Sequence, residues 1–152
     1  EFLLLEEFAS AEVKDGYFIG GKLDAGEGTK EDLLITDYKT YSSKTKPKAI
    51  PAYYRYQLLT LAALWTRKGY NVTRIRLVYV NRHIEGDISE KTGKQLKSYP
   101  SEVTVLTETL VPADMEFINS LLELCVDSCE ATIKHPELTH VIWHDNRLKI
   151  TN

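Results

Sequence analysis

Three stretches decide the fold: GGKLDAG at Gly20–Gly26, LLITDYKT at Leu33–Thr40 and YYRYQLL at Tyr53–Leu59. The middle stretch is apolar until it ends in an acid-any-Lys pattern, as in a buried strand that reaches a surface. Pro51 suits the first turn of a helix and Gly69 suits its end, so we expect a helix over 51–68. These stretches predict a strand with a helix packed against its sheet.

The segments around them supply further strands and a second helix. We expect two strands in the first 24 residues, because Asp-Gly in the turn Lys14–Gly16 is a strong hairpin signal. The other expected segments are a turn-rich stretch at 25–30, strands at 32–39, 72–80 and about 103–111, a polar excursion at 81–100, a long helix from Pro112, and short helix or coil after Pro136. This order predicts an α/β fold with a mixed central β-sheet flanked by α-helices.

Size and composition favour one domain over 1–152. The chain has 152 residues and is 43% hydrophobic, which is enough for one core. No apolar stretch approaches the roughly 20 residues needed to span a bilayer, and no secretory signal is visible, so we expect a cytoplasmic protein. The chain starts at Glu1 directly in an apolar run, and we expect an upstream N-terminal helical element to be missing. Two cysteines, Cys125 and Cys129, exclude a disulfide framework.

Positive charge is concentrated in one part of the sequence. The net charge is −3, yet residues 38–84 hold ten of the 19 Lys and Arg residues and none of the 22 acidic ones. This segregation predicts one cationic surface on an otherwise acidic body, which suits a nucleic-acid partner. The alternative is that these residues are the solvated faces of a helix and a strand.

Two carboxylates and a lysine carry the chemistry. Side chains alternate along a strand, so Asp37 and Lys39 share a face and Tyr38 points away. Asp24 ends the preceding strand, and pairing of the two strands as a hairpin brings its carboxylate beside Asp37. Adjacent carboxylates repel unless a proton or a cation lies between them. Hard divalent ions prefer such oxygen ligands, and the Tyr38 backbone carbonyl adds another, so the pattern predicts a Mg²⁺ or Mn²⁺ site.

The motif order GxxD, then DYKT, then a helix containing QL resembles the RecB-like branch of the PD-(D/E)XK nucleases. The matched motifs lie between Gly21 and Leu58. The resemblance implies a restriction-endonuclease-like core, with Asp24 and Asp37 as metal ligands, Lys39 as the catalytic lysine, and Gln57 approaching the metal and the DNA.

The sequence departs from the branch at three places. Leu23 replaces the proline of the family name, and Leu61 stands where a tyrosine usually follows the glutamine. The acidic residue or histidine of an upstream helix is absent. Glu6 or Glu7 could supply that acid or could be exposed strand residues, and Glu7 is our candidate for the further metal ligand.

Residues after the motif predict contacts with DNA. Basic loops position phosphates and aromatic rings stack on unpaired bases, and both occur in the set Lys44, Lys46, Lys48, Tyr53, Tyr54, Arg55 and Tyr56. The alternative for the tyrosines is packing beneath the helix. His135, His140 and His144 lack further ligands, so zinc is not expected, and two cysteines do not supply the four that hold an iron–sulfur cluster in some relatives.

The sequence therefore predicts a Mg²⁺- or Mn²⁺-dependent deoxyribonuclease, by resemblance an exonuclease acting on DNA ends or single strands in a bacterial or phage-infected cell. The alternative is a catalytically silent nucleic-acid-binding or scaffold module for recombination or packaging. A protein partner in recombination or repair, the oligomeric state, the polarity of digestion and the choice between DNA and RNA stay open.

Overall fold

The computed structural model describes residues 2–41, 46–81, 88–89, 91–95 and 102–142. Its elements are β1 (Phe2–Leu5), β2 (Phe8–Lys14), β3 (Tyr17–Lys22), β4 (Ala25–Gly28), β5 (Leu33–Tyr41), α1 (Ala52–Arg67), β6 (Val72–Asn81), β7 (Glu102–Thr109), α2 (Pro112–Lys134) and the 3₁₀ turn η1 (Pro136–Leu138). Five strands form a mixed sheet in the order β1-β4-β5-β6-β7, in which β5 and β6 are parallel and the other pairs antiparallel. The predicted mixed α/β architecture is confirmed.

The N-terminal third differs from the sequence expectation. The first 22 residues form three strands rather than two, and the stretch expected to be turn-rich contains β4. The predicted turn is present, with Asp15 and Gly16 both at positive φ between β2 and β3. Those two strands form a separate two-stranded sheet, while β1 and β4 belong to the large sheet. The apolar alternation was too weak to separate these short strands, because β4 (AGEG) contains no large apolar side chain.

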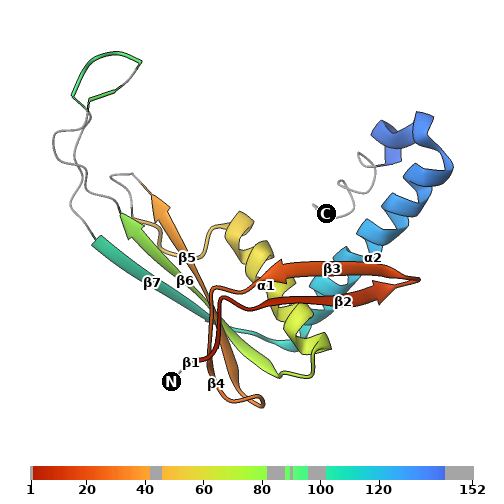
Figure 1. Ribbon diagram of the computed structural model, residues 1–152, viewed down its shortest axis with the longest axis horizontal. Helices are drawn as coiled ribbons and strands as arrows, with labels where there is room; N and C mark the ends of the chain where they lie inside the picture. Colours follow the sequence, from red (N-terminus) through yellow and green to blue (C-terminus); the bar gives the residue numbers. More distant parts are fainter. Residues whose placement is uncertain (1, 42–45, 82–87, 90, 96–101, 143–152) are drawn as a thin grey trace.

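Helix α1 lies between the large sheet and the β2–β3 hairpin, with α2 beside it (Figure 1). The helix joins the parallel strands β5 and β6, a connection that needs a crossover because the end of β5 and the start of β6 lie at opposite sides of the sheet. Lys14 of β2 and Asp127 of α2 form an ion pair of 2.5 Å that ties the hairpin to the second helix. One face of the large sheet is therefore covered by α1.

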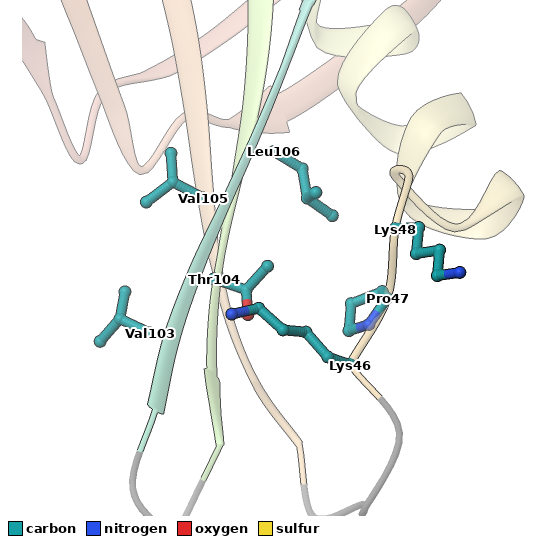
Figure 2. Close-up of a pocket in the computed structure, with 7 residues that line it drawn as sticks. All are labelled: Lys46, Pro47, Lys48, Val103, Thr104, Val105 and Leu106. Atoms are coloured by element: carbon teal, nitrogen blue, oxygen red, sulfur yellow. The ribbon is translucent and has the colours of Figure 1, made fainter.

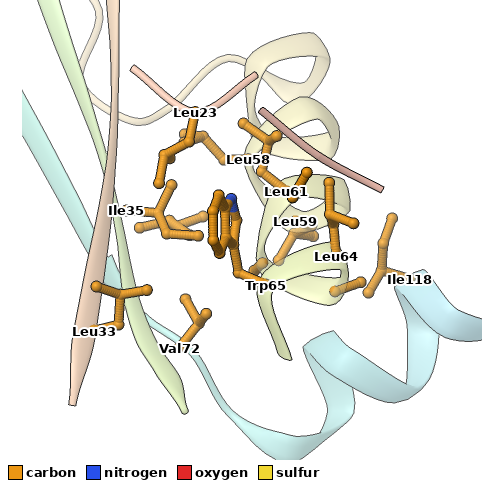
Figure 3. Packing of buried hydrophobic residues seen from close by; sticks show 14 of the residues in the cluster. Leu23, Leu33, Ile35, Leu58, Leu59, Leu61, Leu64, Trp65, Val72 and Ile118 are labelled. Carbon is orange, nitrogen blue, oxygen red and sulfur yellow. The ribbon is translucent and has the colours of Figure 1, made fainter. Parts of the chain in front are cut away.

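The hydrophobic core forms where α1 meets this face of the sheet. Its fully buried side chains include Leu23, Leu33, Ile35, Leu58, Leu59, Leu64, Ile75, Leu77 and Ile118 (Figure 3). Burying a leucine or isoleucine side chain stabilises the fold by about 1.5–3 kcal/mol. Since Leu33, Ile35 and Asp37 share one face of β5, the apolar packing fixes the direction of the acidic side chain that follows.

A glycine permits the close approach of β3 to α1. A Cβ atom at Gly21 would lie 2.9 Å from Cδ2 of Leu61 and 3.6 Å from Cδ2 of Leu64. This contact explains why Leu61, in the position where the branch carries a tyrosine, is buried with 6% exposure. Gly21, the glycine of the GxxD motif, thus lets the backbone pack closely against α1 three residues before Asp24.

A substitution at Gly28 tests whether the β4–β5 turn requires glycine. Its φ is +109°, and an added Cβ would lie 2.3 Å from the backbone oxygen of Asp32. We expect Gly28→Ala to lower the free energy of unfolding by about 3 kcal/mol, because strained backbone and a backbone clash add. Gly16→Ala is the matched control: its φ is +79° with nothing within 4 Å of the added Cβ, so we expect a loss of only about 1 kcal/mol. Equal losses in urea denaturation would contradict this account.

Candidate active site

Asp37 lies where β5 leaves the core, and two polar side chains donate hydrogen bonds to it. The residue is 3% exposed. Its Oδ1 accepts hydrogen bonds from Nζ of Lys39 at 2.8 Å and from Nε2 of Gln57 at 3.3 Å. The same Lys39 Nζ lies 2.8 Å from Oδ2, which is buried and makes no hydrogen bond in the described part of the chain. One oxygen of Asp37 is thus left for a further ligand.

Asp24 reaches the same place from the segment between β3 and β4. The sequence placed it at the end of a strand; instead it lies where the chain passes from the small sheet to the large one. Its Oδ2 accepts a hydrogen bond of 2.9 Å from the backbone N–H of Tyr38. The N–H and C=O of one residue point to the same side of an extended strand. The Tyr38 carbonyl therefore faces Asp24 as well.

The two carboxylates influence each other. Burial raises the pKa of Asp37 above its ordinary value, the Lys39 ammonium acts in the opposite direction, and the charge and hydrogen-bonding contact of Asp24 raise it further. A carboxylate pair in which one member is buried favours a bound cation, since the cation removes the repulsion and fills the remaining oxygen.

Glu7 lies near the pair through its backbone. The Leu23 N–H donates to the Glu7 carbonyl at 2.8 Å, and the Glu6 N–H donates to the Asp24 carbonyl at 3.0 Å. The Glu7 side chain is exposed. Within the described ranges, no three His, Cys, Asp or Glu side chains gather closely enough to hold a metal ion. The structure thus brings Asp24 and Asp37 together but does not add Glu7 to them.

An aromatic cluster adjoins Lys39. Its Nζ lies 5.6 Å from the ring centre of Tyr54, a cation–π distance. Tyr54 meets Tyr79 edge-on at 5.9 Å, and Tyr79 stacks on Tyr41 at 4.2 Å. Tyr41 and Tyr79 were not singled out from the sequence, because only the parallel β5–β6 register, which pairs Lys39 with Tyr79, reveals their position.

The other predicted tyrosines divide between solvent and packing. Tyr53 is 77% exposed, whereas Tyr56 contacts Phe117 at 5.9 Å between ring centres. Lys46 and Lys48 lie on the segment that leads into α1. Lys44 and His144 lie outside the described residues.

Arg55 has a structural position. Its guanidinium donates to Glu108 of β7 at 2.7 Å and to Asp114 of α2 at 2.8 Å. The Val111 N–H and then Arg55 hold the pKa of Asp114 below its ordinary range. Arg74 and Arg76 likewise pair with Asp32 and Glu27. Much of the positive charge in residues 38–84 is therefore paired with acidic side chains, rather than gathered on one unpaired cationic surface.

These observations coincide with a family assignment. The model of the PD-(D/E)XK nuclease superfamily matches residues 2–133, and the chain belongs to this superfamily, whose members are generally nucleases that use divalent metal ions. No curated protein matches the chain significantly. A solved structure titled "Crystal structure of SSO0001" is similar with 19% identity and a TM-score of 0.43 over 86% of this chain. The chain spans about half (49%) of the length of that protein.

None of the helices in the described part of the chain is both long and apolar enough to cross a membrane.

The arrangement around Arg55 can be tested by stability. Arg55→Ala leaves Glu108 and Asp114, whose side chains are 30% and 17% exposed, without their shared cation. We expect a loss of about 2 kcal/mol in the free energy of unfolding, between the values for exposed and buried pairs. Arg74→Ala removes the more exposed pair with Asp32 and serves as the control, with an expected loss below about 1 kcal/mol. An Arg55→Ala variant as stable as the wild type would refute the structural role.

Proposed function

We propose that this protein is a Mg²⁺- or Mn²⁺-dependent nuclease of the RecB-like branch that hydrolyses phosphodiester bonds of DNA. The observation that carries the proposal is the buried Asp37 carboxylate, which Lys39 and Gln57 contact and beside which Asp24 lies. A structural ion pair would need only Lys39. The convergence of a second carboxylate and an amide on one buried acid is the pattern of a reaction site.

The donor set suits a hard divalent cation. Asp37 Oδ2, the carboxylate of Asp24 and the Tyr38 carbonyl are all oxygens, which Mg²⁺ and Mn²⁺ prefer. Asp24 is half-buried, which leaves room for water and for a phosphate oxygen beside it. When bound, such an ion polarises a phosphoryl oxygen and lowers the pKa of a coordinated water. Glu7 remains our proposed additional ligand, reached by a rotation of its exposed side chain.

The chain's own groups have separate tasks in this proposal. Lys39 holds Asp37 in place and presents a positive charge to the phosphate, where it stabilises the negative charge that develops on attack by water. Gln57 fixes the Asp37 carboxylate from the side of α1. The Tyr38 N–H orients Asp24. One short segment of β5 therefore fixes the positions of both carboxylates, Asp24 and Asp37.

The surroundings support a nucleic-acid strand as the substrate. Lys46 and Lys48 offer contacts to phosphates, and the exposed Tyr53 offers a stacking surface for a base. Tyr54 and Tyr56, on the same helix, are further proposed contacts to the nucleic acid. We propose an exonuclease, from the resemblance to the RecB-like branch. Stacking tyrosines require unpaired bases, which supports DNA ends or single strands as the substrate. Arg55 would contact the nucleic acid only if it broke its ion pair with Glu108 or Asp114.

We also propose that the chain functions as one nuclease domain. One core cluster includes residues from both sheets and both helices, from Leu4 to Ile118. The motif residues lie on, or directly beside, elements that contribute to this cluster.

Degradation of end-labelled linear DNA, single-stranded and duplex, tests the proposal. We expect loss of label with Mg²⁺ or Mn²⁺ and none with EDTA. Lys39→Ala and Asp37→Asn should each lower the rate by at least about 10²-fold, since each removes a group that acts on the transition state or its cation.

Two matched variants control for charge and fold. Lys68→Ala removes an exposed lysine at the end of α1, and Asp32→Asn neutralises an exposed carboxylate of the β4–β5 turn. Both should cleave at the wild-type rate. Cleavage that survives Lys39→Ala and Asp37→Asn would overturn the assignment of the site.

A further inference from the structure

A pocket lined by two lysines lies beside the candidate active site, at the edge of the sheet formed by β7. Its walls are Lys46, Pro47 and Lys48 on one side and residues 103–106 on the other, and its volume is about 470 Å³. Figure 2 shows Thr104 and Leu106 pointing toward the 46–48 segment, while Val103 and Val105 point away. The pocket thus opens on the face of the sheet that also carries Asp37 and Lys39.

The strand register connects this pocket to the active site. Lys39 of β5 pairs with Tyr79 of β6, and Tyr79 pairs with Thr104 of β7. Residues in register on neighbouring strands share a face, and strands lie about 4.8 Å apart. The Cα atoms of Lys39 and Thr104 are therefore roughly 10 Å apart, with the aromatic cluster between them.

Thr104 carries the observation that points to a ligand. The residue is only 5% exposed, and its Oγ1 is buried without a hydrogen-bond partner among the described residues. Buried hydroxyl groups nearly always have a partner, because losing water without replacement is costly. A hydroxyl that lines a pocket with two lysines is arranged to donate to an anion.

The lysines of the pocket could bind an anion in place of an acidic side chain. Lys46 Nζ forms an ion pair of 2.5 Å with Glu102, and both side chains are about half-exposed (52% and 44%). Lys48 has no acidic partner within the described ranges. An entering anion can replace Glu102 at Lys46 at little cost, since an exposed ion pair contributes little stability.

We propose that this pocket binds a second phosphate of the substrate strand, held by Lys46, Lys48 and the Thr104 hydroxyl. The proposal rests on the proposed nuclease function and extends it: the scissile phosphate lies at Asp37 and Lys39, and the strand crosses the Tyr54–Tyr79 cluster to reach the pocket. Glu102 shields Lys46 in the free protein. The phosphate is either an internal phosphodiester or a terminal phosphate of the strand.

Binding of a labelled single-stranded 12-nucleotide DNA in EDTA, followed by fluorescence anisotropy, tests the pocket without cleavage. Thr104→Val removes the hydroxyl while keeping the shape of the side chain, and we expect affinity to fall about tenfold, as for loss of a hydrogen bond to a charged group. Thr104→Ser retains the hydroxyl and should bind within about twofold of wild type. Since the hydroxyl of Thr104 is unpaired, Thr104→Val should not lower the melting temperature.

The lysine and glutamate variants test the charge exchange. Lys46→Ala should reduce the slope of log affinity against log salt by about 0.7, the value for one phosphate contact on a single strand. Glu102→Gln should tighten binding, because Lys46 is released. Lys68→Ala and Thr107→Val, on the opposite face of β7, are the controls and should leave affinity unchanged.

The outcomes separate the pocket from the nuclease. Unchanged affinity in both Thr104→Val and Lys46→Ala would overturn the pocket, even where DNA is cleaved and the nuclease proposal stands. Weakened binding by both variants, in a protein that never cleaves, would support the pocket and overturn the nuclease. A Thr104→Val effect confined to oligonucleotides with a terminal phosphate identifies that phosphate as the ligand, and an effect on all oligonucleotides identifies an internal one.

Discussion

The burial of the Asp37 carboxylate at the end of an apolar strand is the constraint on which the rest of the site depends. A charged group with 3% exposure is expensive unless other groups compensate it. Lys39 supplies a charge from the same face of β5, and Gln57 supplies an amide from α1. Both can do so only because the β5-α1-β6 unit packs Leu33 and Ile35 against the helix. The apolar core thus positions the polar site directly.

The distribution of charge separates structural from functional cations. Arg55, Arg74 and Arg76 each have acidic partners on neighbouring elements. Near the face of Lys39, Lys46 forms an exposed ion pair with Glu102, and Lys48 has no acidic partner in the described part of the chain. In the proposed function, a short row of groups beside the active site contacts the phosphates of the nucleic acid.

Much of the site was accessible from the sequence, because its signals are local. Asp37 and Lys39 are two residues apart on one strand, and the helix with Gln57 is bounded by Pro51 and Gly69. The prediction that Asp24 ends a strand was wrong in detail. The short strands β3 and β4 on either side of Asp24 have no clear alternation of apolar and polar residues, and they belong to different sheets. Arg55 was predicted to contact DNA because its partners Glu108 and Asp114 are more than 50 positions away in the sequence. Thr104 and Tyr79 carry no signal in one sequence; only the strand register aligns them with Lys39.

The most direct test of the central claim is a calorimetric titration of Mn²⁺ into the protein without DNA, with Asp24→Asn, Asp37→Asn and Asp32→Asn beside the wild type. The account predicts one site in the wild type and in Asp32→Asn, weakened at least about tenfold in the other two variants, since each loses one of two charged ligands. Equal affinity in all four proteins would show that Mn²⁺ binds elsewhere and would contradict the account.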